Sequence, residues 1–338
     1  MSGPSVSISL VTYNGMRWLP RCIDSVLGQS SGDLELRVLD NASSDGSLAW
    51  LRSRALEDPR MNVEASATNL GYAAGHNRAL GACSGAFVLL LNQDVDLAPG
   101  FLRAAIDVLR ERPTVAAVQG RLLRLGEGGE RMHTIDTTGL VMARDRRVAC
   151  RGQGELDGPG HATAGPVWGA DGPAPVYRRS ALLDARLPRR GGGWEILDED
   201  FFMWKEDVDL AWRLRRLGWE AWYEPAALAW HARGTGGIVS PSWLTSARSY
   251  RAVAPRARVL SWRNQRLAQV KNDARSAFLR DLPWIVRREV VSLALTVVMD
   301  PCRLRAVPMT LRALPDAMRK RRVLQRRLAV RRESDGVA

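Results

Sequence analysis

The stretch LLLNQDVDLAPG, residues 89–100, joins an apolar run to a polar turn and decides how the chain is interpreted. Residues 87–91 carry no polar side chain, which predicts a strand inside a parallel sheet that is covered on both faces. In open α/β sheets ligands bind beyond the carboxyl ends of the strands, so Asp94 and Asp96 stand where a metal ion or a proton would be held. The alternative is a polar turn that caps a helix starting near Pro99.

The composition is that of an ordinary soluble protein. The 338 residues are 46% hydrophobic and 25% charged, which allows one large domain with extensions or two domains. Four cysteines without a CxxC spacing suggest neither a zinc site nor a disulfide framework, and a reducing cytosol fits best. We expect no signal peptide, and the apolar run at 290–299 is shorter than the ~20 residues of a membrane-spanning helix.

The net charge of +13 is concentrated near the carboxyl end. Residues 303–332 hold eleven Lys or Arg and one acidic residue, Asp316. Such a segment is attracted to an anionic membrane, a nucleic acid or a polyphosphate without regard to sequence. The alternative is a solvated helical face.

The first 125 residues alternate strands and helices with short turns, the rhythm of a doubly wound sheet. Right-handed crossovers place the carboxyl ends of its strands on one edge. We therefore expect a cleft lined by the polar residues that end these strands. They are Tyr13-Asn14, Asp40-Asn41, Thr68-Asn69 and Asn92 to Asp96.

The rest of the chain is less regular. Residues 135–150 predict a hairpin, and glycine-rich and proline-rich stretches between about 126 and 200 suit mobile loops over a site. After a strand-like segment at 220–231 the pattern is helical to about residue 330. Breaks in these helices are expected at Pro283, Pro301, Pro308 and Pro315.

A second group of carboxylates lies in FFMWKEDVDLAWRLRRLGW, residues 201–219. Helical spacing places Asp207 at the head of an apolar stripe, so this carboxylate faces inward and is a candidate catalytic group. Interaction with the helix dipole is the alternative. The other face predicts a solvated, salt-bridged surface that contains Glu206, Asp209, Arg213 and Arg216.

Two further features each have a structural and a functional interpretation. His231 follows the strand-like segment and is either a core histidine or a ligand. The aromatic cluster of Phe201, Phe202 and Trp204 is either core or a platform on which a sugar stacks. The chain has no P-loop, strand-linked GxGxxG or GxSxG motif, so the usual signatures of nucleotide hydrolysis, dinucleotide redox chemistry and serine hydrolysis are missing.

Six motifs in order resemble inverting glycosyltransferases of family 2 with the GT-A fold, and among them the bacterial rhamnosyltransferase-like branch. The motifs are SLVTYN, LDNASSDGS, NLGYAAGHNRAL, LLLNQDVDLAPGFL, GADGPAPVYRRSAL and FFMWKEDVDLAWRLRRLGW. The resemblance covers roughly residues 5–240. It implies a GT-A domain over residues 1–240, built on a doubly wound and mostly parallel sheet. Residues 241–338 would form a helical, basic extension at a membrane surface.

The resemblance also implies a nucleotide-sugar site. Thr12, Tyr13 and Asp40 would hold the base and the ribose. The other residues implied for this site are Asn14, Asn69, Gly71, Gly75, Asn77 and Asn92.

The NQD sequence stands where the family carries its Asp-x-Asp metal motif. Asn92 replaces the first aspartate, so Asp94 would be the main ligand of Mg²⁺ or Mn²⁺, ions that prefer oxygen ligands. Asp96 is a substitute ligand or a helix cap. His231 matches a histidine that often completes this metal site.

By the same resemblance, Asp207 is the general base that removes the proton from an acceptor hydroxyl, and a single displacement inverts the anomeric carbon. Acceptor choice would lie with the loops at 126–200 and the aromatic cluster. The acceptor-side residues are Trp168, Gly169, Asp171, Trp204 and Glu206.

The rhamnosyltransferase-like branch suggests dTDP-L-rhamnose as the donor, although the scaffold also serves other dTDP-, UDP- and GDP-sugars. The basic, partly apolar tail would dip into a lipid headgroup region. We therefore expect a peripheral protein on the cytoplasmic face of the membrane. It would use a lipid-linked or polysaccharide acceptor in cell-surface glycan assembly.

Three alternatives remain open at this stage. A nucleic-acid-binding protein would use the basic tail, but a cleft lined by carboxylates repels nucleic acid, so no such partner is expected. A GT-A nucleotidyltransferase would need a basic glycine-rich loop after the first strand, and TYNGMRWLPR matches poorly. The third alternative is an inactive scaffold with the same fold.

Overall fold

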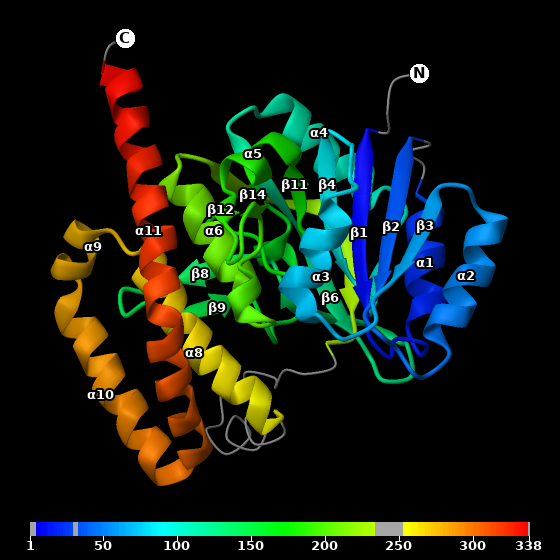
Figure 1. Ribbon diagram of the computed structural model, residues 1–338. Helices are drawn as coiled ribbons and strands as arrows, with labels where there is room; N and C mark the ends of the chain where they lie inside the picture. Colours follow the sequence, from blue (N-terminus) through cyan, green and yellow to red (C-terminus); the bar gives the residue numbers. More distant parts are fainter. Residues whose placement is uncertain (1–4, 30–32, 234–252, 337–338) are drawn as a thin grey trace.

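The apolar residues 87–92 form strand β4 near the middle of the central sheet in the computed structural model of the protein. The structure describes residues 5–29, 33–233 and 253–336, with side chains up to Arg331. Helices pack on the sheet, and a further group of helices stands at the end of the sheet away from β3 (Figure 1). The sheet, with its mainly parallel first half, and the C-terminal helices confirm the predicted α/β class.

The elements follow one another as a βα alternation and then as antiparallel additions. The strands are β1 (Val6–Thr12), β2 (Leu34–Asp40), β3 (Met61–Ala65), β4 (Phe87–Asn92), β5 (Val95–Leu97), β6 (Val115–Leu125), β7 (Arg131–Thr137), β8 (Leu140–Met142), β9 (Val148–Cys150), β10 (Gly165–Val167), β11 (Val176–Arg178), β12 (Leu187–Pro188), β13 (Trp194–Glu195) and β14 (Glu220–His231). The α-helices are α1 (Leu19–Leu27), α2 (Ser47–Glu57), α3 (Gly71–Leu80), α4 (Phe101–Glu111), α5 (Arg179–Asp184), α6 (Glu206–Arg216), α8 (Pro255–Asn272), α9 (Arg275–Arg280), α10 (Leu282–Met299) and α11 (Ala306–Gly336). The 3₁₀ turns are η1 (Pro159–His161), η2 (Glu199–Phe201) and η3 (Pro301–Arg305).

Strand β4 is apolar because both faces of the sheet are covered around it. Leu89 and Leu91 pack in a core that includes α1 and α4, whereas Val88 and Leu90 pack in a second core with α3, α5 and α6. Strand β1 pairs in parallel with both β4 and β2, and β2 pairs in parallel with β3. The carboxyl ends of these four strands therefore share one edge, as predicted.

Strand β11 joins this parallel half to the second half of the sheet. It pairs antiparallel with β4 on one side and with β6 on the other. Strand β14 pairs in parallel with β6, and the short strand β5 pairs antiparallel with the end of β14. His231, at the end of β14, is thereby brought opposite Val95, next to the NQD turn.

The predicted hairpin at 135–150 forms in part. Strands β8 and β9 make a two-stranded antiparallel sheet, while residues 131–137 pair with β6 instead. Helix α1 begins at Leu19, so Pro20 starts the helix rather than bending it. Prolines 283 and 301 lie at the starts of α10 and η3, as expected.

Two predicted breaks are wrong, because α11 runs without interruption through Pro308 and Pro315. Pro308 lies in the first helical turn, where a missing N–H costs little. Pro315 is interior, but Ala313 and Ala317 on either side of it are buried against α8. Tertiary packing holds the helix together there.

The C-terminal helices are joined to the α/β part by buried charges. Lys320 of α11 is 1% exposed and contacts Glu195, Asp198 and Asp316 at 2.8, 2.6 and 2.9 Å. Lys271 of α8 is equally buried and pairs with Asp198. These contacts make the extension an integral part of the folded chain.

Part of the basic tail is therefore not a solvated face. Besides Lys320, Arg331 pairs with Asp184, and Arg321 and Arg327 donate to backbone carbonyls of other elements. The predicted boundary near residue 240 lies outside the described residues. None of the helices in the described part of the chain combines the length and apolar character needed to cross a bilayer.

Candidate active site

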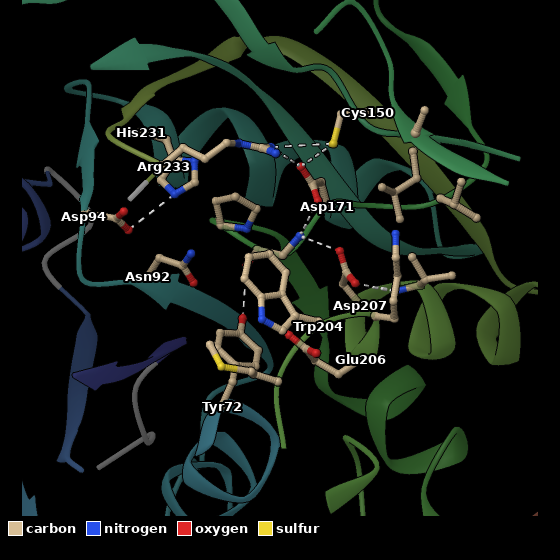
Figure 2. Close-up of a pocket in the computed structure, with 18 residues that line it drawn as sticks. Tyr72, Asn92, Asp94, Cys150, Asp171, Trp204, Glu206, Asp207, His231 and Arg233 are labelled. Carbon is tan, nitrogen blue, oxygen red and sulfur yellow. Dashed lines mark hydrogen bonds and ion pairs between the residues drawn. The ribbon is translucent and has the colours of Figure 1, made fainter. Parts of the chain in front are cut away.

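The polar turn after β4, the end of β14 and the start of α6 meet around a cavity of about 250 Å³ (Figure 2). Asp94 and His231 lie on one side of this cavity, Asp207 lies on the other, and Asp171 lies between them. The predicted site residues that line it are Asn92, Asp94, Asp171, Trp204, Glu206, Asp207 and His231. Side chains from distant parts of the sequence, from Asn92 to His231, thus share one cavity.

His231 stands between two carboxylates. Its Nε2 lies 3.3 Å from Oδ1 of Asp94, and its Nδ1 lies 2.8 Å from Oδ2 of the fully buried Asp136. Burial alone would lower the pKa of His231, but Asp94 and Asp136 outweigh it and raise the pKa to about 9. A histidine held at one nitrogen by a carboxylate, with the other nitrogen beside a second carboxylate, is a common arrangement of metal ligands.

Asp94 and His231 could supply some, but not all, of the ligands that a hard divalent cation needs. Asp94 and His231 present one oxygen and one nitrogen to the same point, and the carboxylates around the imidazole favour positive charge there. Within the described residues no cluster of three or more His, Cys, Asp or Glu side chains could hold a metal ion. A cation at Asp94 and His231 would therefore need further ligands from a diphosphate and water.

Arg233 connects the two sides of the cavity. Its guanidinium contacts Asp136 at 2.8 Å and Asp171 at 3.3 Å. The two carboxylates raise the pKa of Arg233 further above its usual value, although burial acts in the opposite direction. Cys150 lies 3.3 Å from Asp171, and burial raises the pKa of its thiol to about 12. A chain of ionic contacts thus runs from His231 through Asp136 and Arg233 to Asp171.

Asp207 lies in the first turn of α6 and points into the cavity. Its Oδ1 accepts a hydrogen bond from the Val208 N–H at 2.7 Å, and its Oδ2 accepts one from the Gly172 N–H at 3.3 Å. Burial and the neighbouring Asp171 carboxylate raise the pKa of Asp207. The apolar residues of the stripe that it heads are buried, as predicted: Leu210, Ala211, Leu214 and Leu217.

The prediction of a solvated face on α6 is wrong. Asp209 and Arg213 form the expected pair at 3.1 Å, but both are fully buried. Asn272 of α8 donates to Asp209 at 2.7 Å and covers this face. Glu206 is also buried, and burial together with Asp207 raises its pKa. The physical reason is that α8, a helix much later in the chain that begins at Pro255, covers the face that the local pattern leaves to solvent.

The loop before α6 is strained and is held from two directions. Phe202, Trp204 and Lys205 have φ values of 62°, 76° and 73°, which non-glycine residues rarely adopt. The N-terminus of α3 caps the Phe202 carbonyl through the N–H groups of Tyr72 and Ala73 at 2.7 and 3.1 Å. This contact sets the position from which Glu206 and Asp207 enter the cavity.

Asn264 of α8 holds the same loop from the other side. Its side-chain amide is fully buried and donates to the carbonyls of Phe201, Met203 and Trp204 at 3.0, 3.0 and 2.8 Å. Because Asn264 does not itself line the cavity but holds the loop that does, it is a positioning residue for α6.

Replacing Asn264 with leucine is expected to cost about 1–3 kcal/mol of stability, because several buried carbonyls lose their donor. Turnover should fall more than nucleotide affinity, since the loop carries Asp207 but not the nucleotide-side residues. Denaturant unfolding, together with kcat and KM, measures both effects. Asn272→Leu is the matched control, because Asn272 is equally buried on α8 but donates to Asp209 within α6 and not to the loop before it. Equal losses of kcat in the two variants would contradict the positioning role.

The predicted nucleotide residues cluster beyond the ends of β1 and β2. The Thr12 hydroxyl and the Tyr13 N–H both donate to Oε1 of Gln93, at 2.6 and 2.9 Å. Asp40 is fully buried, and its Oδ2 accepts from the Ser43 N–H at 3.0 Å. Its Oδ1 has no hydrogen-bond partner within the described residues. A hydrogen-bond donor of a bound ligand or a water would satisfy this buried acceptor.

Two other nucleotide-side residues remain at the surface of this cluster. Tyr13 is 49% exposed, as a side chain available for stacking would be. Asn14 accepts a hydrogen bond from the Ser44 N–H at 2.8 Å and joins the loops after β1 and β2.

The residues predicted in and before α3 have structural contacts instead. Asn77 is buried and bonds the backbone of Ile196 and Leu197, and Gly75 gives room for Val11 of β1. Gly71 has a φ of 82°, and a Cβ there would lie 2.6 Å from the Phe202 carbonyl oxygen. Asn69 accepts from the Gly71 N–H at 2.9 Å. These residues shape the wall by supporting loops rather than by lining the cavity.

Three further predicted residues lie away from the cavity. Asp96 points to the opposite side of β5, where Arg21 and Arg131 pair with it at 3.7 and 3.1 Å, so it does not substitute for Asp94 as a ligand. Trp168 packs edge-on against Trp212, and Gly169 allows close contact with Ala211 of α6. Both pack against α6 and do not line the cavity.

Sequence reasoning missed Asp136, Arg233 and Gln93. Asp136 lies in β7, whose pairing with β6 carries no local signal, and Arg233 follows β14 without a motif. Gln93 stands inside the NQD turn, but only the fold shows that it bridges to Thr12.

Comparison with known proteins relates the chain to glycosyltransferases. Residues 7–168 match the family model of Glycosyl transferase family 2. An N-acetylglucosaminyl-diphospho-decaprenol L-rhamnosyltransferase of Mycobacterium tuberculosis is 28% identical over 252 residues, covering 67% of this chain and 76% of the relative. A pre-mycofactocin glycosyltransferase of the same organism is 31% identical over 239 residues, 69% of this chain but 44% of that protein.

Solved structures share the architecture. A mannosyltransferase from Pyrobaculum calidifontis, in complex with GDP-Man and Mn²⁺, aligns with a TM-score of 0.53 at 18% identity, over 99% of this chain and 88% of that one. S. aureus TarS 1–349 in complex with UDP-GlcNAc aligns with a TM-score of 0.54 at 17% identity, over 93% and 81% of the two chains. At these identities the likeness concerns the fold, while the family follows from the sequence matches. The chain belongs to family 2 of the glycosyltransferases and has the GT-A fold.

Proposed function

We propose that this glycosyltransferase moves L-rhamnose from dTDP-L-rhamnose, with inversion, onto a lipid-linked acceptor in cell-surface glycan assembly. The observation that carries the mechanism is the cavity in which Asp94 and His231 stand on one side and Asp207 on the other. The similarity to the mycobacterial rhamnosyltransferase supports the sugar and the acceptor class. The same scaffold with another dTDP-, UDP- or GDP-sugar is the second candidate.

Each side of the cavity has its own part in this mechanism. Asp40, Tyr13 and Asn14 bind the nucleoside at the ends of β1 and β2, and Asn92 faces the cavity below them. Asp94 and His231 would hold Mg²⁺ or Mn²⁺, with Asp136 fixing the imidazole. A divalent cation in this place neutralises the negative charge of the diphosphate leaving group.

Asp207 carries the proton transfer. As the acceptor oxygen forms its bond to the anomeric carbon, the hydroxyl proton moves to a carboxylate oxygen of Asp207, and the bond from the anomeric carbon to the diphosphate oxygen breaks. Attack on the face opposite the diphosphate inverts the configuration. The raised pKa of Asp207 makes it a stronger base than an ordinary aspartate.

The C-terminal helices suit a membrane surface as binding partner better than they suit a nucleic acid. Several of their cations are engaged inside the protein, whereas apolar side chains of α10 are exposed: Val286, Val290, Val291, Leu293, Leu295, Val297, Val298 and Met299 are at least 48% exposed. Nucleic acid binding would need free cations and gains nothing from such a face. We therefore propose that the protein acts at the inner face of the cell membrane.

The proposal is tested by thermal stabilisation of the purified protein with dTDP, UDP, GDP and their sugars, with and without Mn²⁺. Binding to the native state at 100 times Kd adds about 2.7 kcal/mol of stability. We expect the largest metal-dependent shift in Tm with dTDP-L-rhamnose. A larger shift with another nucleotide sugar favours the second candidate, and no shift with any of them contradicts the transferase function.

Replacing Asp94 with alanine should abolish the metal-dependent part of that stabilisation, because the carboxylate ligand is lost. Stabilisation by the nucleotide alone should remain. Asp96→Ala is the matched control two residues away, since Asp96 faces Arg21 and Arg131. A metal-dependent shift that survives in Asp94→Ala and disappears in Asp96→Ala would reverse the assignment.

A further inference from the structure

A second cavity, of about 610 Å³, lies between the β8–β9 hairpin, α8 and α10. It shares Val148, Ala149 and Lys205 with the cavity around Asp207, so the two spaces adjoin. Its volume is in the range of sites that hold small organic ligands. A ligand in the second cavity would have one end beside Lys205, two residues before Asp207.

The walls of this cavity are strongly cationic. Asp145 is the acidic residue of the lining, and the cationic residues are Arg147, Lys205, Arg266, Arg287, Arg288 and Arg303. Glu289 pairs with Arg266 and Arg288, Asp145 pairs with Arg147, and Asp300 pairs with Arg303. No ion pair among the described residues involves Lys205 or Arg287. An excess of positive charge therefore faces the cavity.

One of these cations is built into the wall. The Arg266 guanidinium stacks 3.3 Å from the ring centroid of Trp262 and donates to its carbonyl at 3.0 Å. The Trp262 indole N–H in turn donates to the Ser292 hydroxyl at 3.3 Å. Burial lowers the pKa of Arg266 to about 10. A fixed, partly desolvated guanidinium binds diphosphate groups well, because little order is lost on binding.

An apolar wall leads from the cavity to the outside of the molecule. Val291 and Leu295 of α10 line the cavity and are 51% and 48% exposed. The surface continues through Val298, which is 79% exposed. A ligand that matches both features has an anionic head and a long hydrocarbon chain.

We propose that the second cavity is the acceptor site and binds the diphosphate of a prenyl-linked sugar, with the prenyl chain along α10 towards the lipid. This inference rests on the proposed function, which it extends to the acceptor. A second copy of the chain is a poorer occupant, because Arg305, Arg312 and Arg322 are exposed on α11 and η3 beside exposed apolar side chains. These cations repel one another across a symmetric contact and attract anionic lipid.

The test measures binding of farnesyl diphosphate to the full-length protein by titration calorimetry. Inorganic diphosphate and farnesol serve as the head alone and the chain alone, and both should bind more weakly than the intact probe. Arg287→Glu should weaken farnesyl diphosphate binding about tenfold or more, the loss of about one charged contact. Arg312→Glu is the matched control, because it makes the same charge change on an exposed helix outside the cavity, and it should change affinity less than twofold.

Four outcomes would overturn the inference: no binding of farnesyl diphosphate, equal binding of farnesol, equal effects of the two charge reversals, or a dimer in sedimentation that Val298→Asp dissociates. Flotation on phosphatidylglycerol vesicles separates general lipid attraction, which both charge reversals reduce alike, from the site. Mn²⁺-dependent stabilisation by nucleotide sugars should persist in Arg287→Glu, which shows that the variant folds. If nucleotide sugars with Mn²⁺ do not stabilise the wild-type protein but farnesyl diphosphate still binds, the proposed function is contradicted and the anion-binding site is retained.

Discussion

Asp207→Asn is expected to lower kcat by about 10²- to 10⁴-fold while the Kd for the nucleotide sugar changes little. The amide keeps the shape, and its one oxygen can still accept from the Val208 N–H, but its NH2 group neither accepts from the Gly172 N–H nor takes a proton. Donor binding is preserved because the nucleotide residues and Asp94 are untouched. Single-turnover kinetics with a saturating donor measure the loss directly.

Glu206→Gln is the matched control for this change, one residue away in the same cavity. Burial and Asp207 raise the pKa of Glu206 and favour its neutral form, so its amide isostere should reduce kcat less than tenfold. The base must be deprotonated to act, and a raised pKa means that activity is lost on acidification at a higher pH than for an ordinary aspartate near 3.9. Unchanged kcat in Asp207→Asn, or an equal loss in Glu206→Gln, would remove Asp207 from this role.

Lys320→Met should destabilise the protein by about 3–5 kcal/mol, because it leaves buried carboxylates without their counter-ion. Lys320 contacts Glu195, Asp198 and Asp316 within 2.9 Å, and the neighbouring elements leave it 1% exposed. The carboxylates hold the pKa of Lys320 above its usual value, although burial opposes them. Urea unfolding followed by circular dichroism measures the change in free energy.

Arg322→Met, two residues further along α11, controls for the loss of one positive charge. Arg322 is exposed, so its replacement should change stability by no more than about 0.5 kcal/mol. The same urea midpoint for both variants would show that the buried ion pairs of Lys320 add nothing to stability.

Deletion of α11 removes Lys320 with it, so a truncated protein reports on folding as well as on membrane attachment. Point variants of α10 separate the two.

The sequence alone was enough to predict those site residues that lie at the carboxyl ends of strands. An uninterrupted apolar strand followed by Asn92 and Asp94 implies a covered parallel sheet and polar groups at its carboxyl edge, and the structure has both. Helical spacing alone predicted that Asp207 faces inward, and Asp207 lines the cavity. His231 was a candidate because a strand ends at it, and its partner Asp94 lies across the β5–β14 pairing.

Other parts depend on contacts between distant residues. The exposure predicted for Asp209 was wrong because the covering residue, Asn272, comes from another helix. Nothing local marks Asn264 as the residue that holds the loop before α6, since its role exists only when α8 packs there. Asp96 has the same residue type as Asp94, two positions away, and only the fold shows that Asp94 lies in the turn before β5 whereas Asp96 lies inside β5 and pairs with Arg21 and Arg131.

The short strand β11 has a consequence for the order in which the chain folds. It is the connection between β4 and β6, and it lies at residues 176–178, more than 80 residues after β4. During synthesis the first βα units emerge early, but one edge of β4 has no strand paired with it until β11 has been made. Strand β6 in turn pairs with β11 and with β14, which is made later still. Such long-range pairing is slow to form, and an open apolar edge favours association between chains. Production at low temperature or with chaperones in excess should therefore raise the yield of folded protein more than changes to the C-terminal surface do.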